Sequence, residues 1–387
     1  MKRYSGNYDE GFVFDKAKAN IIFGPRSSIT DDQVAIVIEP GAQGCDITLA
    51  GDVTAGQFGI YSYAYDTSIT IKHGGKVASD IGILLTGRDQ SVANEGNIKA
   101  AEFGVAITGV RPDLTNEGTI SAYVAVSFQG ANHGQFVNER SGQIIGDEYG
   151  VIFGAASLTS ENELINLGSI VAPVYAFYGS EASDRLTNRG VIDGDIFLHN
   201  GDDTFNGRHG TTIGQVHGGG GDDRYLIDNA AADIAEDVNG GKDTVISSVD
   251  YQLFHNFEML TLTGRKDISG RGNDEDNTII GNAGDNRLYG YEGYNTLAGG
   301  RGDDWLFGGS QQDTFVFGTG DGHDAIKNFE DNVDYLDLSG WKGLSDLDVL
   351  LSHTGEKNGD LIISFRGDQL TIESLTKAQL DAGDFVG

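Results

Sequence analysis

The sequence predicts an all-β protein that consists of two β-solenoids, one after the other along the chain. Glycine accounts for 58 of the 387 residues and proline for only 4, and this ratio favours turn-rich β-repeats over collagen or disorder. Residues 45–195 repeat at a period of about 22 residues. Residues 281–316 repeat a shorter pattern without a break. Two periods in two parts of the chain indicate two solenoids whose coils differ in length.

The repeats of the N-terminal half are marked by a turn that begins with asparagine. The clearest copies are NEGNI (94–98), NEGTI (116–120), NERSGQI (138–144), NLGSI (166–170) and NRGVI (188–192). Segments rich in Val, Ile and Phe lie between them, so each copy supplies a short strand, a glycine turn and a second short strand. We therefore predict a β-helix-like solenoid over residues 31–195. Residues 1–30 are expected to cap it, because an open solenoid end exposes unpaired strand edges.

The recurring asparagine predicts a ladder of stacked side-chain amides along this solenoid. Its members are Asn94, Asn116, Asn138, Asn166 and Asn188. Glutamates follow three of them, and because stacked like charges repel one another we expect these side chains to face water. They are Glu95, Glu117 and Glu139. A role for these carboxylates in chemistry on a sugar is the alternative.

The C-terminal half contains four tandem units of nine residues. They are GNAGDNRLY (281–289), GYEGYNTLA (290–298), GGRGDDWLF (299–307) and GGSQQDTFV (308–316). Each follows the form G-G-x-G-x-D-x-U-x, where U is a large apolar residue. Glycines let backbone carbonyls converge, and position six adds a carboxylate or amide oxygen. Calcium prefers six to eight oxygen ligands, whereas zinc requires the Cys or His that these units lack. The units therefore predict Ca²⁺ as the bound ion.

This pattern resembles the nonapeptide repeats of RTX (hemolysin-type) calcium-binding proteins. The resemblance extends over about 198–387 and includes a spacer-like segment at 241–264. It implies that the second solenoid is a calcium-binding parallel β-roll, which with its spacer occupies residues 196–340. The fold class is then all-β, an N-terminal β-helix-like solenoid followed by this roll.

The resemblance also implies an export route. Members of this family leave the cell through a type I secretion apparatus that uses an uncleaved C-terminal signal. Residues 341–387 are the expected secretion-signal region, and their last stretch, LTKAQLDAGDFVG, is similar to such a signal. The start of the chain, MKRYSGNYDEGF, has no apolar core of a secretory signal peptide. A secreted, extracellular protein is therefore expected.

Two units form one coil of a β-roll, so turns eighteen residues apart are expected on the same edge. Position six would then form one stack of Asn277, Asn295 and Asp313, and another of Asn286, Asp304 and Asp324. Because asparagine offers an oxygen without a charge, we expect calcium to bind most tightly at Asp304 and Asp324 and less tightly at Asn295 and Asp313. The position-eight residues would form the core, and these are Leu288, Leu297, Leu306 and Phe315.

The predicted metal-site residues are the position-six side chains and the turn glycines. In the main array they are Asn286, Asn295, Asp304, Asp313, Asp324, Gly300, Gly302, Gly309, Gly320 and Gly322. The segment HGGGGDDRYLID (217–228) adds Gly219, Gly221 and Asp223, and the weaker match LHNGDDTFNG (198–207) adds Asp203. For this last turn, an ordinary Asx or type I turn is an equal alternative.

Composition limits the partners. The net charge of −32 argues against nucleic acid and anionic membranes, and it opposes folding unless cations neutralise it. No run of eighteen apolar residues occurs, so we predict no membrane span. Cys45 is the sole cysteine, which excludes an internal disulfide, and we expect it to be buried. A bound metal can take the place of disulfides outside the cell.

The sequence favours a binding protein over an enzyme. The zinc-protease motif H-E-x-x-H and the lipase motif G-x-S-x-G do not occur. We expect calcium binding and calcium-triggered folding, with the first solenoid as an interaction module for an extracellular polysaccharide or a cell-surface component. The alternative is a polysaccharide lyase or epimerase on the N-terminal β-helix. Such an enzyme needs a concave site where carboxylates meet Arg, Lys or His.

Overall fold

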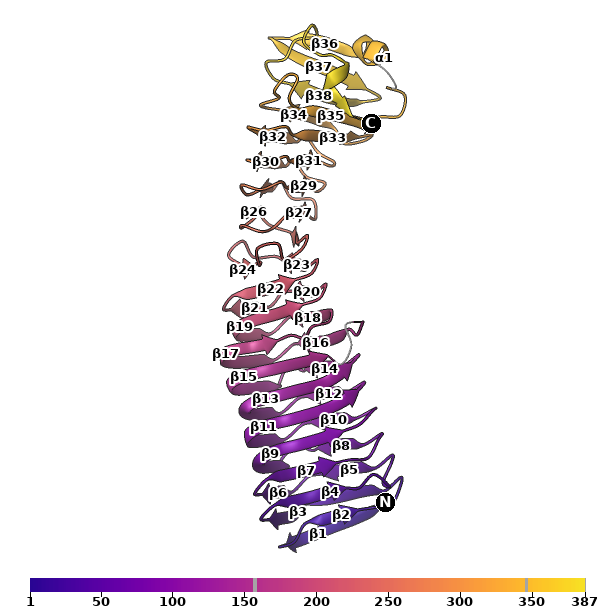
Figure 1. The fold of residues 1–387 in the computed structure, drawn as a ribbon, viewed down its shortest axis with the longest axis vertical. Helices are drawn as coiled ribbons and strands as arrows, with labels where there is room; N and C mark the ends of the chain where they lie inside the picture. The colour runs from indigo at the N-terminus through magenta and orange to yellow at the C-terminus, as the bar shows by residue number, and fades with distance from the viewer. Residues whose placement is uncertain (156–158, 345–346, 387) are drawn as a thin grey trace. The chain divides into compact units, whose positions relative to one another are not determined.

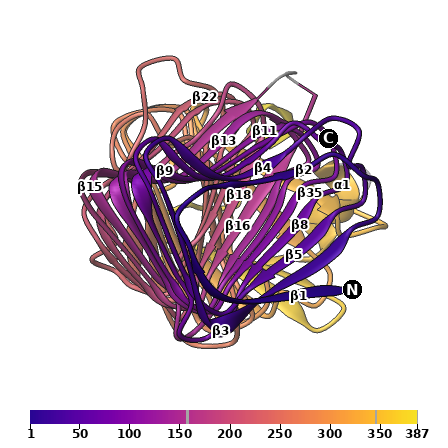
Figure 2. The ribbon, with the colours of Figure 1, turned by 90° about the horizontal axis from the view of Figure 1, so that it is seen from below.

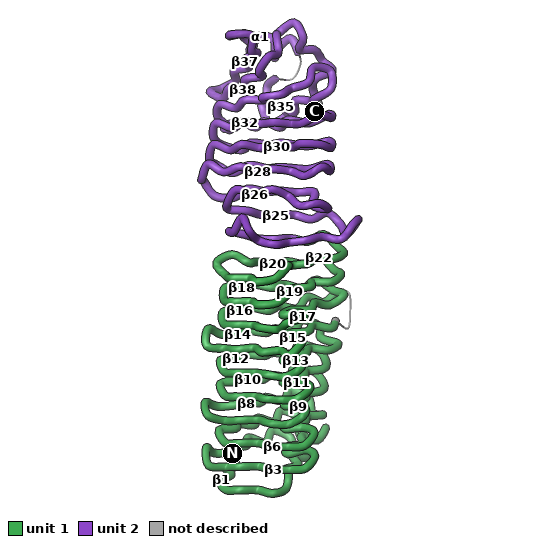
Figure 3. Tube along the Cα trace, turned by 90° about the vertical axis from the view of Figure 1, so that its left-hand side faces the viewer, with its two compact units in different colours: residues 1–223 green, residues 224–387 purple. Residues whose placement is uncertain are grey.

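The computed structural model describes residues 1–155, 159–344 and 347–386. Among them the chain is built almost entirely of parallel strands, with a short helix α1 (Leu347–Ser352) and a 3-10 turn (Ala382–Asp384) near its end. It divides into two compact units, residues 1–223 and 224–387 (Figure 3). The predicted all-β solenoid class is confirmed. In the described part of the chain, no helix has the length and apolarity to cross a membrane.

Unit 1 is a β-helix whose rungs have three strand segments each (Figures 1 and 2). Its first face stacks β5 (Asp46–Leu49), β8 (Ser68–Ile71), β10 (Ser91–Asn94), β12 (Asp113–Asn116), β14 (Gln135–Asn138), β16 (Asn162–Asn166), β18 (Asp184–Asn188) and β20 (Thr204–Asn206). Each strand pairs in parallel with the next, and the inward residues are apolar. Ile69, Val92 and Leu114 are all at most 2% exposed.

The other two faces come from long strands that bend. They are β9 (Lys76–Thr86), β11 (Asn97–Val110), β13 (Thr119–Asn132), β15 (Gln143–Ala155), β17 (Ser169–Tyr178) and β19 (Val191–Asn200), followed by β21 (Thr211–Ile213) and β22 (Val216–Gly220). The pairing of β11 with β13 shifts register between Lys99 and Phe103. A glycine follows the bend, and a Cβ on Gly104 would lie 2.5 Å from the carbonyl oxygen of Ala125. The sequence pattern predicted two strands a rung, because this bend leaves the apolar pattern uninterrupted.

The N-terminal residues form the first rungs of the solenoid. The strands are β1 (Lys2–Tyr8), β2 (Phe12–Phe14), β3 (Asn20–Asp31), β4 (Val34–Ile38), β6 (Asp52–Ala55) and β7 (Phe58–Ser62). β1 pairs with β3, which pairs with β5 and β6. Aromatic rings cover this end, because Tyr4 and Phe12 both lie about 5 Å from Phe23. Residues expected to form a separate cap therefore continue the β-helix.

The predicted asparagine ladder is confirmed. Each side-chain amide nitrogen donates to the amide oxygen one rung on, at 2.8 Å from Asn94 to Asn116 and from Asn116 to Asn138. The ladder continues through Asn166 to Asn188 at 2.8 and 2.9 Å. All five side chains are at most 1% exposed. An amide both donates and accepts, so each amide of the stack satisfies the next. Nδ2 also donates to a backbone carbonyl oxygen, as from Asn94 to Thr119 at 3.2 Å and from Asn166 to Val191 at 3.1 Å.

Unit 2 is a narrower solenoid with two faces. One face stacks β23 (Arg224–Ile227), β25 (Thr244–Ser247), β27 (Met259–Leu262), β29 (Thr278–Ile280), β31 (Thr296–Ala298), β33 (Thr314–Gly318), β35 (Tyr335–Gly340) and β39 (Phe385–Val386). The other stacks β26 (Tyr251–Gln252), β28 (Ser269–Arg271), β30 (Arg287–Tyr291), β32 (Trp305–Gly309), β34 (His323–Ile326) and β38 (Asp368–Ile372). A two-residue strand, β24 (Ile234–Ala235), precedes them. The predicted core residues Leu288, Leu297, Leu306 and Phe315 are fully buried.

The C-terminal region folds onto the last coils of unit 2. β38 pairs in parallel with β34 and antiparallel with β37 (Asp360–Phe365), which pairs with β36 (Thr354–Lys357). The buried Trp341 donates from Nε1 to the carbonyl oxygen of Gly318 at 2.7 Å. Residues expected to form the secretion signal thus include strands of the unit. Unit 1 extends to residue 223, past the expected boundary at 195/196, because β20 and β22 pair with its last rungs. Cys45 is buried, as expected.

Candidate functional site

The position-six residues of unit 2 form two ladders along its turns. The backbone N–H of Asn286 donates to Oδ1 of Asp304 at 2.7 Å, and that of Asp304 donates to Oδ1 of Asp324 at 3.0 Å. In the other ladder, Asn277 donates to Asn295 at 3.0 Å and Asn295 donates to Asp313 at 2.9 Å. These contacts have the register that the eighteen-residue period predicted.

The structure adds Asp334 to the second ladder. The N–H of Asp313 donates to Oδ1 of Asp334 at 2.8 Å, and Asp334 is 1% exposed. Both ladders therefore end in a pair of carboxylates. The nine-residue period does not predict Asp334, because the loop after β33 interrupts that period. The available signal was Leu336, an apolar residue two positions later, which has the spacing of position six to position eight.

Two of these carboxylates have an oxygen with no hydrogen-bond donor. Oδ2 of Asp304 and Oδ2 of Asp313 are buried and have no partner, although Oδ1 of each accepts a backbone N–H. Each carboxylate folds over the first glycine of its unit. A Cβ on Gly299 would lie 2.2 Å from Oδ2 of Asp304, and one on Gly308 the same distance from Oδ2 of Asp313. A buried carboxylate oxygen without a donor is unfavourable, and a hard cation would satisfy it.

Burial raises the pKa of every acid in the two terminal pairs. Loss of hydration is the largest cause, and together with the negative charges of the neighbouring Asp303 and Asp321 it raises the pKa of Asp304 to about 7 and that of Asp324 to about 8. The same desolvation raises the pKa of Asp313 and Asp334 to about 6. Without a metal, each of these carboxyls therefore keeps its proton to a higher pH than an ordinary aspartate, and Asp304 and Asp324 do so up to about neutral pH. A divalent cation would favour the ionised form instead.

The predicted glycines are needed for two different reasons. Gly300, Gly302, Gly320 and Gly322 have φ values of +91°, +125°, +90° and +114°, which other residues rarely adopt. Gly309 is needed for close approach, because a Cβ there would lie 1.6 Å from the carbonyl oxygen of Tyr291. The last turn is closed from the C-terminal region. Asp368 accepts the N–H of Gly320 at 2.8 Å and that of Gly322 at 3.3 Å.

A similar ladder lies in unit 1. The N–H of Asp184 donates to Oδ1 of Asp203 at 2.6 Å, and the N–H of Asp203 donates to Oδ1 of Asp223 at 2.7 Å. Oδ2 of Asp203 is buried without a partner, and desolvation raises the pKa of this acid to about 10. Gly219 and Gly221 have φ values of +109° and +125°. The turn of Asp203, the weaker match to the nonapeptide pattern, thus lies directly beside that of Asp223, the stronger match.

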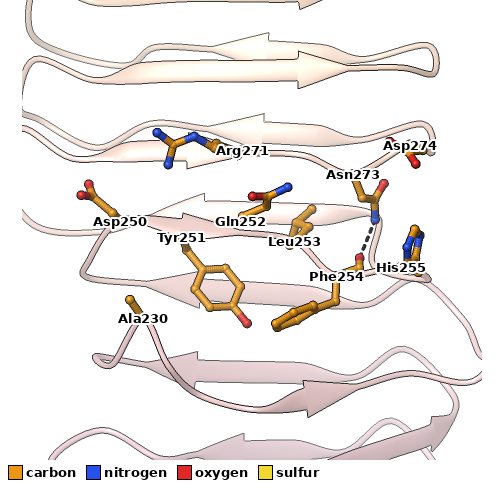
Figure 4. Close-up of a pocket in the computed structure, with 10 residues that line it drawn as sticks. All are labelled: Ala230, Asp250, Tyr251, Gln252, Leu253, Phe254, His255, Arg271, Asn273 and Asp274. Atoms are coloured by element: carbon orange, nitrogen blue, oxygen red, sulfur yellow. Dashed lines mark hydrogen bonds between the residues drawn. The ribbon is translucent and has the colours of Figure 1, made fainter.

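Two hollows in the surface are relevant to the alternative of a polysaccharide lyase or epimerase, which needs carboxylates close to basic groups. One of about 330 Å³ lies along the turns of unit 1, where its lining includes Lys76, Glu95 and Glu117. Glu117 is exposed, and Glu95 is half-buried and forms an ion pair with Lys72. The other, of about 610 Å³, lies in unit 2 around β26 and β28 (Figure 4). Its lining includes Asp250, Tyr251, Gln252, Phe254, His255 and Arg271. Each hollow places carboxylates and basic groups on its wall.

Comparison with known proteins matches the turns of unit 2 to one family. The model of the RTX calcium-binding nonapeptide repeat matches residues 271–293 and 292–323. These ranges contain Asp304 and Asp313, the acids whose second oxygens have no donor. Asp334 and the ladder of unit 1 lie outside them.

Two curated relatives come from Rhizobium meliloti (strain 1021). Endo-1,3-1,4-beta-glycanase EglC is 38% identical over 169 residues, 43% of this chain and 34% of the relative. Endo-1,3-1,4-beta-glycanase ExsH is 34% identical over 225 residues, 57% of this chain and 44% of the relative. The chain thus spans less than half the length of these relatives.

Among solved structures, the extracellular lipase LipA from Serratia marcescens is similar over 66% of this chain and 44% of the lipase, at 17% identity and a TM-score of 0.28. The match to the nonapeptide model agrees with the residue pattern and with the two ladders. Residues 271–323 of this chain thus contain RTX calcium-binding nonapeptide repeats.

Proposed function

We propose that this chain binds calcium at the acidic turns of unit 2. The observation that carries the proposal is the pair of buried Oδ2 atoms, on Asp304 and Asp313, that have no hydrogen-bond donor. Backbone carbonyl oxygens lie close to these turns, since a Cβ on Gly300 would lie 2.5 Å from that of Asn282 and one on Gly302 would lie 2.6 Å from that of Gly284. Such oxygens suit calcium. The family model that matches here is that of a calcium-binding repeat.

The pair Asp304 and Asp324 is the tightest proposed site. It combines two carboxylates with one oxygen that has no donor, and four glycines of positive φ shape its two turns. The pair Asp313 and Asp334 ranks second, because Oδ2 of Asp334 already accepts the N–H of Glu330 at 2.8 Å. Pairs that include Asn286 or Asn295 rank below both, since each offers one charge fewer.

A single substitution tests this site. Asp304→Asn keeps the shape of the side chain and removes its charge, so we expect calcium affinity to fall roughly tenfold to a hundredfold, as for the loss of one strong electrostatic contact. Isothermal titration of the full chain with calcium measures it. Asp303→Asn is the matched control, because Asp303 is the exposed neighbour in the same turn. Equal losses in the two variants would contradict the proposal.

We further propose that calcium triggers folding of the acidic turns outside the cell, after type I export. The net charge of −32 and the buried carboxylates both oppose the metal-free fold. An ion bound only by the folded state stabilises it by RT ln(1 + [L]/Kd) for each site. Circular dichroism of the full chain in EGTA and in millimolar calcium tests this switch. Identical spectra and melting curves would refute it.

A polysaccharide is the second candidate partner. Both curated relatives are named as glycanases, and the hollow along unit 1 presents Glu95 and Glu117 beside Lys76. Co-sedimentation of the full chain with insoluble mixed-linkage β-glucan tests binding, with Glu117→Gln as the variant and Glu102→Gln as an exposed control outside the hollow. Release of sugar products would point to an enzyme, and retention without products to a binding module.

A further inference from the structure

The turns at 273–277 and 282–286 differ from the acidic turns in both defining positions. Each has asparagine at position two, where the pattern has glycine, and asparagine at position six, where it has aspartate. The four residues are Asn273, Asn277, Asn282 and Asn286, and none is more than 9% exposed. Two turns on opposite edges of the roll thus share the same double replacement.

The position-two amides bind backbone carbonyls of the preceding coil. Nδ2 of Asn273 donates to the carbonyl oxygens of Phe254 at 2.6 Å and Phe257 at 2.9 Å (Figure 4 shows the first of these bonds). Nδ2 of Asn282 donates to those of Thr263 at 3.2 Å and Lys266 at 3.1 Å. In both turns, one NH₂ group bridges two carbonyls that are three residues apart.

The position-six amides complete the same arrangement. Nδ2 of Asn277 donates to the carbonyl oxygen of Phe257 at 2.9 Å, and Nδ2 of Asn286 donates to that of Ile268 at 3.0 Å. Their Oδ1 atoms accept the N–H of Asn273 and of Asn282, each at 2.7 Å. Both oxygens therefore have a donor, in contrast to Oδ2 of Asp304.

We propose that these asparagines replace calcium, so that the turns at 273–286 are locked by amides and fold without the ion. Converging carbonyl oxygens need a positive partner, and either a cation or an N–H can supply it. Here two NH₂ groups in each turn supply it without charge. Their hydrogens point at the carbonyls that a cation would require, so they also exclude the ion. This inference rests on the proposed calcium binding of the acidic turns.

The lock gives the roll a calcium-independent segment. The carbonyls that the amides bind belong to residues 254–268, so the spacer and the first two nine-residue turns form one hydrogen-bonded body. The N–H of Asn286 then donates to Asp304, which places the first acidic turn directly on this body. The acidic turns would thus stack on a template that is already folded when calcium arrives.

Hydrogen exchange of the full chain tests the lock. In EGTA we expect amides within 273–289 to stay protected to within about threefold of their level in calcium, and those within 300–316 to lose at least roughly tenfold of their protection. Loss of protection at 273–289 in EGTA would overturn the lock. Continued protection of 300–316 in EGTA would contradict calcium-triggered folding but would still agree with the lock. The experiment therefore distinguishes a failure of the lock from a failure of the proposed function.

A double variant tests the exclusion of calcium. Asn282→Gly with Asn286→Asp restores the nonapeptide pattern at 281–289. We expect one additional calcium ion per chain by native mass spectrometry, together with calcium-dependent protection of that segment. Ala283→Gly is the matched control, because Ala283 is an exposed residue of the same turn and the variant keeps both amides. A folded double variant with an unchanged number of bound ions would overturn the proposal.

Discussion

The asparagine ladder of unit 1 and the aspartate ladders of unit 2 stack one buried polar residue per coil, but they solve the same problem differently. Asn116 donates to Asn138 and accepts from Asn94, so each amide satisfies the next. Asp304 accepts one N–H and keeps a second oxygen without a donor. A carboxylate cannot donate, so a stack of carboxylates requires something positive from outside. Asparagine and aspartate differ only in the NH₂ group or oxygen at the end of the side chain. That difference distinguishes the coils of unit 1, whose amides bond to one another, from the coils of unit 2 that we propose to depend on calcium.

Removal of calcium should produce the largest difference between the two ladders. With EGTA, we expect limited proteolysis of the full chain to cut within 299–334 and to spare 94–155. At a calcium concentration about a hundred times Kd, each site contributes about 2.7 kcal/mol, and that stabilisation is lost without the ion. Mass spectrometry of the fragments locates the cuts. Equal cleavage of both segments would break the comparison.

A carboxylate in the asparagine ladder should destabilise unit 1. Asn116→Asp removes the donor to Asn138 and sets two oxygens against each other at a position now spanned by a 2.8 Å bond. We expect the free energy of unfolding of unit 1 to fall by roughly 2–4 kcal/mol. Urea denaturation in excess calcium measures it. Asn97→Asp is the control, because Asn97 is exposed nearby, and a comparable loss there would show that the ladder is not the cause.

An amide in the aspartate ladder should raise the melting temperature without calcium and lower it with calcium. Asp304→Asn removes a buried charge, so we expect the melting temperature in EGTA to rise by a few degrees, about what 1 kcal/mol produces in a domain of this size. In saturating calcium the same variant should melt below the unchanged protein. Differential scanning calorimetry under both conditions gives the two signs. A shift of the same sign in both would contradict a cation site.

Low pH should stabilise the metal-free roll, and we expect this effect to be smaller than those of the substitutions above. The raised pKa of Asp304, about 7, and of Asp324, about 8, means that the folded state binds protons more tightly than the unfolded chain, whose aspartates titrate near 3.9. Stability in EGTA should therefore rise as the pH falls from about 8 towards 4, and change little below that. Calcium affinity should fall over the same window. Urea denaturation in EGTA at several pH values gives the slope of the unfolding free energy against pH, and this slope should be shallower for Asp304→Asn. An unchanged slope would mean that surface charges cause the effect.

Much of this architecture is visible in the residue pattern because a solenoid is a local structure. Each coil contacts chiefly its neighbours, so one period places Asn286 on Asp304 and buries Leu288 on Leu306. The 22-residue period predicts the asparagine ladder in the same way. The period does not predict Asp334, because a loop changes length before it and the register then depends on how that loop packs. Nor does the residue pattern predict the bends of β11 and β13, where strand direction changes within one apolar run.

The sequence alone determined the two periods, the family of the nine-residue repeats and which side chains face the core, since each follows from residue type and spacing. The tertiary structure decided which oxygens are satisfied. Aspartate at position six indicates a metal, but only the folded turns show that Oδ2 of Asp304 has no donor and that the amide of Asn282 bridges two carbonyls. Hydrogen-bond satisfaction depends on atoms from adjacent coils, and no single repeat contains that information.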